Sequence, residues 1–79
     1  MKFGIKVMPR EVILDAQGRV IEQTLKSENY HVEDCRMGKF IEITMPQMSE
    51  DKAYQEVKKM AEALLHNPLI ETYEISRLQ

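Results

Sequence analysis

The sequence predicts an α+β domain in which two helices cover one face of a four-stranded antiparallel sheet, in the βαββαβ order of ferredoxin-like folds. Three observations lead to this prediction. Apolar residues alternate with polar ones near both ends of the chain, as they do in half-buried strands. A helical period of apolar residues runs through positions 53–64. Gly38 separates two alternating segments in the middle of the chain, as the turn of a β-hairpin would.

Length and composition limit what the chain can be. Its 79 residues make a single domain, residues 1–79, and a domain of this size buries only about 60% of the surface that its unfolded chain exposes. Oligomerisation is a common remedy, and the single cysteine, Cys35, cannot form an internal disulfide. The 11 basic residues against 13 acidic ones argue against a nucleic-acid binder that neutralises phosphates. We expect a cytoplasmic protein, because no signal peptide or membrane-spanning stretch is visible.

The first predicted strand lies at the N-terminus. Phe3, Ile5 and Val7 alternate there with lysine or glycine, and Pro9 ends regular pairing because it has no backbone donor. The next stretch, residues 10–14, contains three consecutive apolar residues. It either extends the strand or forms an apolar connection packed against the sheet, and the sequence leaves both open.

The first helix is predicted to begin after Asp15, whose carboxylate can accept from the free amides of the first turn. Gly18 costs about 1 kcal/mol relative to alanine inside a helix, which indicates close packing against its backbone or exposure of the helix amides to a partner, and we favour packing. Asn29 can take the left-handed conformation that often ends a helix. The predicted buried face of this helix comprises Ala16, Val20, Ile21, Thr24 and Leu25.

The second half of the chain repeats the pattern of strand and helix. Residues 30–35 and 39–45 alternate and are predicted to form the hairpin around Gly38. Ser49 is predicted to cap the second helix, and Pro68 to follow its end. The predicted buried face of this helix is Ala53, Val57, Met60, Ala61 and Leu64, and a last strand, residues 70–75, places Tyr73 and Ile75 toward the core. The opposite sheet face would carry Met8, Phe40 and Thr44 without cover, which favours self-association.

No catalytic constellation is evident in the sequence. His31 lies near acidic residues and could bind a metal, but a solvated strand face explains it better. His66 suits the C-terminal end of a helix dipole, and Cys35 suits a structural position. The pair Gly38 and Lys39 lacks the rest of a phosphate-binding loop. We therefore predict no catalytic, cofactor-binding or metal-binding residues in this chain.

Four segments spread over nearly the whole chain match one family in their order and spacing. They are residues 14–18 (LDAQG), Tyr30 with Val32, residues 36–43 (RMGKFIEI) and residues 65–75 (LHNPLIETYEI). Through them the chain resembles the PurS-type small subunit of phosphoribosylformylglycinamidine (FGAM) synthase, an enzyme of purine biosynthesis. The family often has proline where Ala16 stands and a glycine within residues 11–13, so the connection before the first helix departs from the pattern.

The resemblance implies a PurS-like fold and a non-catalytic subunit of an ATP-dependent carbon–nitrogen ligase. In such systems a large synthetase subunit binds ATP with magnesium and formylglycinamide ribonucleotide, while a glutaminase subunit releases ammonia from glutamine. The small subunit would bridge the two and assist ammonia transfer. It would pair with itself, as a dimer or tetramer, and with both other subunits, but with neither nucleic acid nor membrane. The candidate docking residues are Asp15, Gln17, Gly18, Arg36, Gly38, Lys39 and Asn67.

The alternative hypothesis belongs to another class of protein. A ferredoxin-like regulatory module of this size would bind a small metabolite at a dimer interface, without synthetase partners.

Overall fold

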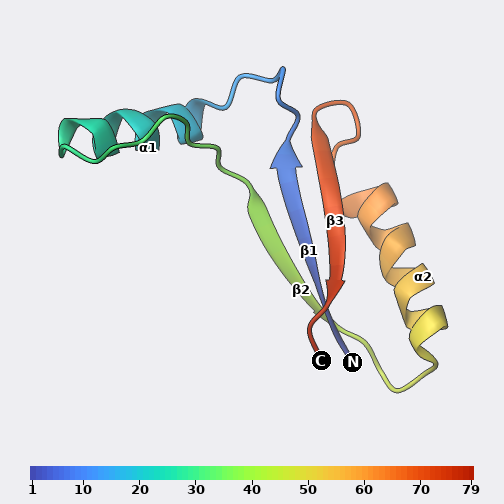
Figure 1. The fold of residues 1–79 in the computed structure, drawn as a ribbon. Helices are drawn as coiled ribbons and strands as arrows, with labels where there is room; N and C mark the ends of the chain where they lie inside the picture. The colour runs from blue at the N-terminus through green and yellow to red at the C-terminus, as the bar shows by residue number, and fades with distance from the viewer.

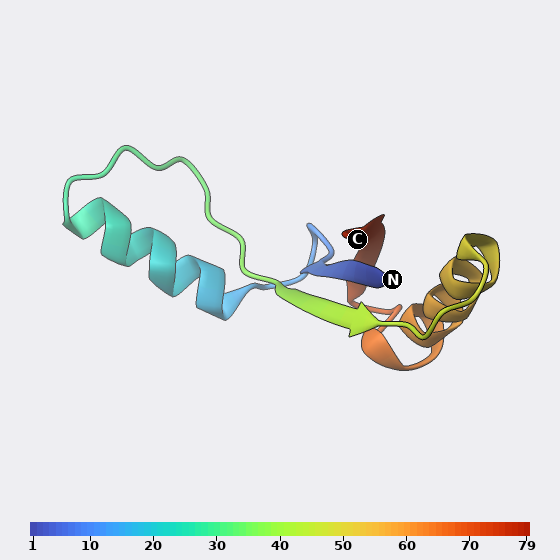
Figure 2. The ribbon, with the colours of Figure 1, turned by 90° about the horizontal axis from the view of Figure 1, so that it is seen from below.

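The structure is a computed structural model that describes all 79 residues. In chain order the elements are β1 (Lys2–Pro9), α1 (Ala16–Ser27), β2 (Lys39–Thr44), α2 (Glu50–Met60), a π-helical turn η1 (Ala61–Leu65) and β3 (Glu71–Arg77). The strands form one antiparallel sheet with β1 at its centre, in the order β2-β1-β3. Helix α2 packs on one face of this sheet, whereas α1 projects away from it (Figures 1 and 2). The molecule is therefore elongated, with extents of 49 × 26 × 13 Å.

The predicted four-stranded sheet is wrong, because residues 30–35 form no strand. Their predicted hairpin partner, β2, pairs only with β1 and remains an edge strand, because residues 30–35 do not lie beside its outer edge. The segment 28–38 instead runs back along α1 to the start of β2 (Figure 2). Helix α1 is about 18 Å long at 1.5 Å per residue, so retracing it takes about half of the length that this segment can span when extended at about 3.3 Å per residue.

Two further predictions are wrong: the hairpin around Gly38 and the placement of both helices on one face of the sheet. No glycine in the chain has a positive φ, so Gly38 is not a left-handed turn residue. Helix α1 lies beyond the sheet rather than over it (Figure 1). By contrast, Asn29 has a φ of 69°, which confirms the predicted left-handed end of α1.

The core lies between β1 and α2. It consists of seven buried residues, Phe3, Ile5, Val7, Met45, Ala53, Val57 and Ala61. The alternation of β1 places its odd-numbered residues on this face, opposite Ile41 of β2 and Ile75 of β3 across the central Ile5. Tyr73 and Ile75 pack against the core, as the alternation of the last strand predicts. The side chain of Ser49 accepts from Lys52 N at 3.3 Å, which confirms the predicted cap of α2.

The end of α2 departs from the predicted helical spacing. The π-helical turn Ala61–Leu65 holds more residues per turn than an α-helix, so it displaces the next apolar position by one residue. Leu64, predicted to be buried, is 84% exposed, and Leu65 packs against the core instead. The Nδ1 atom of His66 makes a 2.5 Å hydrogen bond with the carbonyl of Ala61, which satisfies an acceptor at the end of the turn.

Residues 10–14 neither extend β1 nor pack against the sheet. They form an exposed turn in which Ile13 N donates to Arg10 O at 2.9 Å, and Val12 is 91% exposed. This turn is held against the one that precedes β3, because Arg10 N donates to Ile70 O and the Arg10 guanidinium donates to Pro68 O, both at 2.8 Å. Two segments far apart in sequence thus lie together at one end of the sheet.

The second face of the sheet carries no helix (Figure 1). The strand registers place Phe40 beside Lys6 and Thr44 beside Lys2 on this face, as predicted. The ring of Phe40 lies over Gly4, where a Cβ atom would collide with it. No helix of the chain is long and apolar enough to cross a membrane.

Candidate docking site

The carboxylate of Asp15 joins the start of α1 to the segment that precedes β2. Its Oδ1 accepts from Gly18 N at 2.9 Å, which confirms the predicted helix cap, and its Oδ2 accepts from Met37 N at 2.7 Å. The hydrogen bond from Met37, then that from Gly18 and the charge of Arg36, lower the pKa of Asp15 below its ordinary value of 3.8. One ionised side chain therefore fixes two segments that are 22 residues apart.

Two glycines permit this junction through close approach of backbones. A Cβ atom on Gly18 would meet the Asp15 carboxylate and would lie 2.6 Å from the carbonyl oxygen of Cys35. The predicted close packing at Gly18 is thus confirmed. The segment that packs there is residues 28–38, which run back along α1 and are called the return segment below. A Cβ atom on Gly38 would collide with the Val7 carbonyl and the Met8 sulfur, so Gly38 is needed for contact with β1.

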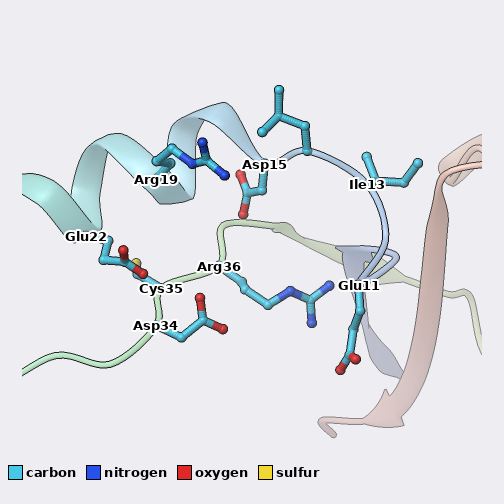
Figure 3. Close-up of a pocket in the computed structure, with 9 residues that line it drawn as sticks. Glu11, Ile13, Asp15, Arg19, Glu22, Asp34, Cys35 and Arg36 are labelled. Atoms are coloured by element: carbon cyan, nitrogen blue, oxygen red, sulfur yellow. The ribbon is translucent and has the colours of Figure 1, made fainter.

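A polar cavity of about 480 Å³ opens beside this junction (Figure 3). It is lined by Glu11, Ile13, Leu14, Asp15, Arg19, Glu22, Asp34, Cys35 and Arg36. The Arg36 guanidinium donates to the carbonyl of Pro9, so it also ties the return segment to the end of β1. No group of three or more His, Cys, Asp or Glu side chains is placed to hold a metal ion.

Most of the predicted docking residues lie around this junction. Asp15, Gln17 and Gly18 occupy the start of α1, whereas Arg36, Gly38 and Lys39 lead into β2. Asn67 lies elsewhere, in the turn before β3, and its contacts are local. Its Oδ1 accepts from Leu69 N at 3.0 Å, and its own N–H donates to Glu71 Oε1 at 2.7 Å.

The two histidines singled out in the sequence lie in different parts of the fold. The ring of His66 lies 4.7 Å between centroids from the ring of Tyr73, tilted by 59°, and the Tyr73 hydroxyl donates to Glu62 Oε1 at 2.9 Å. Partial burial, followed by the hydrogen bond to Glu62, raises the pKa of Tyr73 above 10.0. His31 lies in the return segment rather than on a sheet face. These side chains are spread over opposite ends of the molecule and share no site.

Comparison with known proteins identifies the family. The model of the family described as "PurS: Phosphoribosylformylglycinamidine (FGAM) synthase" matches residues 2–79. The chain belongs to the PurS family. It is 40% identical over 78 residues to the phosphoribosylformylglycinamidine synthase subunit PurS of Thermotoga maritima, covering 98% of this chain and 95% of that protein. It is 38% identical over 73 residues to the PurS subunit of Bacillus subtilis, covering 91% and 86%.

Solved PurS structures share the fold. The crystal structure of the purS subunit from Thermotoga maritima superposes with a TM-score of 0.92 at 38% identity, covering 98% of this chain and 90% of that one. A chain in the structure of PurLQS from Thermotoga maritima gives 0.91 at 40% identity, covering 98% and 95%. Because these matches cover nearly the whole chain, the projecting α1 belongs to the PurS fold.

Sequence reasoning missed one surface of this PurS chain. Ala16, Gln17, Val20, Ile21 and Met37 line an apolar groove of about 390 Å³ along α1. The helical period identifies Ala16, Val20 and Ile21 as part of an apolar face, but the prediction that this face is buried is wrong. Only the position of α1, away from the sheet, reveals that the face is exposed.

Proposed function

We propose that this chain is the PurS subunit of an FGAM synthase, which converts formylglycinamide ribonucleotide to formylglycinamidine ribonucleotide with ATP and glutamine in purine biosynthesis. The family match across residues 2–79 carries this proposal. The likeness to a chain of the PurLQS assembly supports a role beside other subunits. ATP and magnesium belong to the large synthetase subunit in this scheme, and the complex works in the cytoplasm.

The subunit acts by position rather than by chemistry of its own. Its best-placed carboxylate, Asp15, accepts from two backbone amides, and Glu62 accepts from the hydroxyl of Tyr73. These groups maintain the geometry of the fold and are not arranged as an acid and a base around a common point. A bridging subunit needs such a rigid frame, together with surfaces that two different proteins can contact.

The elongated shape suits a bridge. The projecting α1 and the α2 side of the sheet lie at opposite ends of a molecule that is 49 Å long (Figure 1). The junction around Asp15, with Lys39 beside it, lies where α1 leaves the sheet, whereas exposed aliphatic residues such as Leu64 lie at the end of α2. We assign the first surface to docking of one larger subunit, with Arg36, Lys39 and Gln17 at its rim. The glutaminase and synthetase subunits then contact different parts of the same frame, and ammonia passes between them.

Reconstitution tests this function. The chain is combined with the large synthetase and glutaminase subunits, and FGAM formation is measured with glutamine and, separately, with ammonium as the nitrogen source. We expect glutamine-dependent synthesis to require the chain. Equal glutamine-dependent rates with and without it would refute the bridging role.

A charge reversal then tests the docking surface. Lys39→Glu should lower glutamine-dependent synthesis by about tenfold at limiting subunit concentration, because a lost interface contact of about 1.4 kcal/mol weakens binding by that factor. Lys52→Glu, the same change at an exposed site on α2, is the matched control. Equal activity of the two variants would exclude Lys39 from the interface.

A further inference from the structure

Residues 10–37 are separate from the hydrophobic core; we call them the arm, and the remaining residues the body. The arm contains the turn that follows β1, then α1, and then the return segment as far as Met37. The buried core residues, and the half-buried side chains that pack against them, all belong to the body. The arm therefore projects from the sheet without sharing its core (Figure 2).

Two arginines, one at each end of the arm, donate all the hydrogen bonds that join the arm to the body. At the first end, Arg10 N donates to Ile70 O and the Arg10 guanidinium donates to Pro68 O, both at 2.8 Å. At the second end, the Arg36 guanidinium donates to the carbonyl of Pro9. None of the ion pairs of the chain crosses between the arm and the body. The direction of the arm thus depends on these two side chains and on the two backbone connections.

Within the arm, by contrast, α1 and the return segment are joined along their length. Near the joints, the Asp15 carboxylate accepts from Gly18 N and from Met37 N. At the far end of α1, Tyr30 N donates to Leu25 O at 3.0 Å. Because the two segments are joined at both ends, they move together as one rigid unit.

We propose that the arm turns on the body about its two ends, residues 9–10 and residues 37–38, and that Arg10 and Arg36 are the positioning residues that set its direction. Both ends emerge side by side, from the paired strands β1 and β2. Both arginines are exposed, so water competes for their hydrogen bonds and each bond holds the arm only weakly. A rigid-body rotation of about 15°, the size of known subunit rotations, would move the far end of α1 by about 5 Å, because the helix is about 18 Å long.

The proposed docking surface spans this joint. Asp15 and Gln17 lie on the arm, whereas Lys39 lies on the body. The direction of the arm therefore sets the shape of the surface that a larger subunit meets. This use of the joint rests on the proposed function, but the joint itself does not.

Double electron–electron resonance between two spin labels tests the inference. The labels are attached at Gln23→Cys on α1 and Gln55→Cys on α2, in a full chain whose native thiol is removed by Cys35→Ser. Labelled chain is diluted with unlabelled chain, so that only distances within one chain are measured. We expect one narrow distance distribution. Arg10→Gln together with Arg36→Gln should broaden it by up to about 5 Å, the displacement of the helix end.

The matched control is Arg19→Gln, which makes the same change at an arginine of the same cavity. The Arg19 side chain has no hydrogen-bond or ion-pair partner, so this variant should keep the narrow distribution. An unchanged distribution in the folded double variant, or equal broadening by Arg19→Gln, would overturn the proposal.

Hydrogen exchange of the unsubstituted chain covers the case in which the double variant fails to fold. An arm without core contacts opens separately from the body, so amides bonded within it, such as Met37 N, should have protection factors about tenfold lower than the amides of β1. Equal protection of the arm and β1 would indicate a single cooperative unit and overturn the proposal. Because both measurements use the isolated chain, their failure leaves the reconstitution test of FGAM synthase untouched.

Discussion

The π-helical turn at the end of α2 makes a sharp prediction about two adjacent leucines. A regular α-helix would place Leu64 on the buried face, three residues after Ala61. The structure instead exposes Leu64 and packs Leu65 against the core. Truncating each leucine to alanine therefore separates the two geometries with one matched pair of variants.

The expected magnitudes follow from burial. A fully buried Leu→Ala change costs about 2–5 kcal/mol, so the half-buried Leu65 should cost about 2 kcal/mol. For a domain of this size that is a decrease of about 8–16 °C in Tm. Leu64→Ala removes an exposed side chain and should change the free energy of unfolding by less than about 0.5 kcal/mol.

Thermal unfolding followed by far-UV circular dichroism measures both variants. The two proteins are compared with wild type at one protein concentration, because self-association makes Tm depend on concentration. Both variants exchange leucine for alanine in the same turn, so helix propensity does not separate them. If Leu64→Ala lowers Tm as much as Leu65→Ala does, the helix continues without a π-helical turn and the reasoning is wrong.

Two further predictions concern the junction at the start of α1. Gly18→Ala should destabilise the protein in urea unfolding, because overpacking against the Cys35 carbonyl costs about 1–3 kcal/mol and exceeds the gain in helix propensity; a rise in stability would contradict this. The lowered pKa of Asp15 means that its carboxylate stabilises the fold above pH 3.8 and that this contribution is lost as pH falls through the folded-state value. Asp15→Asn should therefore lose less stability than wild type between about pH 6 and pH 3, and equal losses would refute the linkage.

Much of the sheet and of the second helix was predictable because each is defined by local periodicity. The alternation at Phe3, Ile5 and Val7 identifies β1, and the spacing of Ala53 and Val57 identifies the buried face of α2. These patterns depend only on which residues are apolar and how far apart they stand. They hold wherever the neighbouring element lies.

The errors arose where a local pattern had more than one possible neighbour. Residues 30–35 alternate like a strand, but a strand also needs a partner, and the chain carries these residues along α1 rather than along the free outer edge of β2 (Figure 2). Gly38 was assigned to a turn, whereas its role is contact with Val7 and Met8 of β1. The spacing of residues along the chain predicts neither the position of residues 30–35 nor the contact of Gly38 with β1.

The candidate site shows the same division. The cap at Asp15 follows from the sequence of the first helical turn alone, whereas the segment that packs against Gly18, through the Cys35 carbonyl, is known only from the structure. The hydrogen bond from Met37 to Asp15 does not, because it joins residues that only the return of the chain along α1 brings together.

The sequence by itself indicated the family, the three strands that form the sheet and most of the apolar face of each helix, but it also predicted a fourth strand that does not form and placed Leu64 on the buried face. The tertiary structure decided what each apolar face contacts: α2 covers the core, whereas α1 leaves its apolar face, with Val20 and Ile21, exposed to solvent. The physical reason is that periodicity records a side chain's preference for burial, and this preference is satisfied equally by the same chain or by another. In this PurS chain only the projecting position of α1 shows that its apolar face is not buried within the same chain (Figure 1).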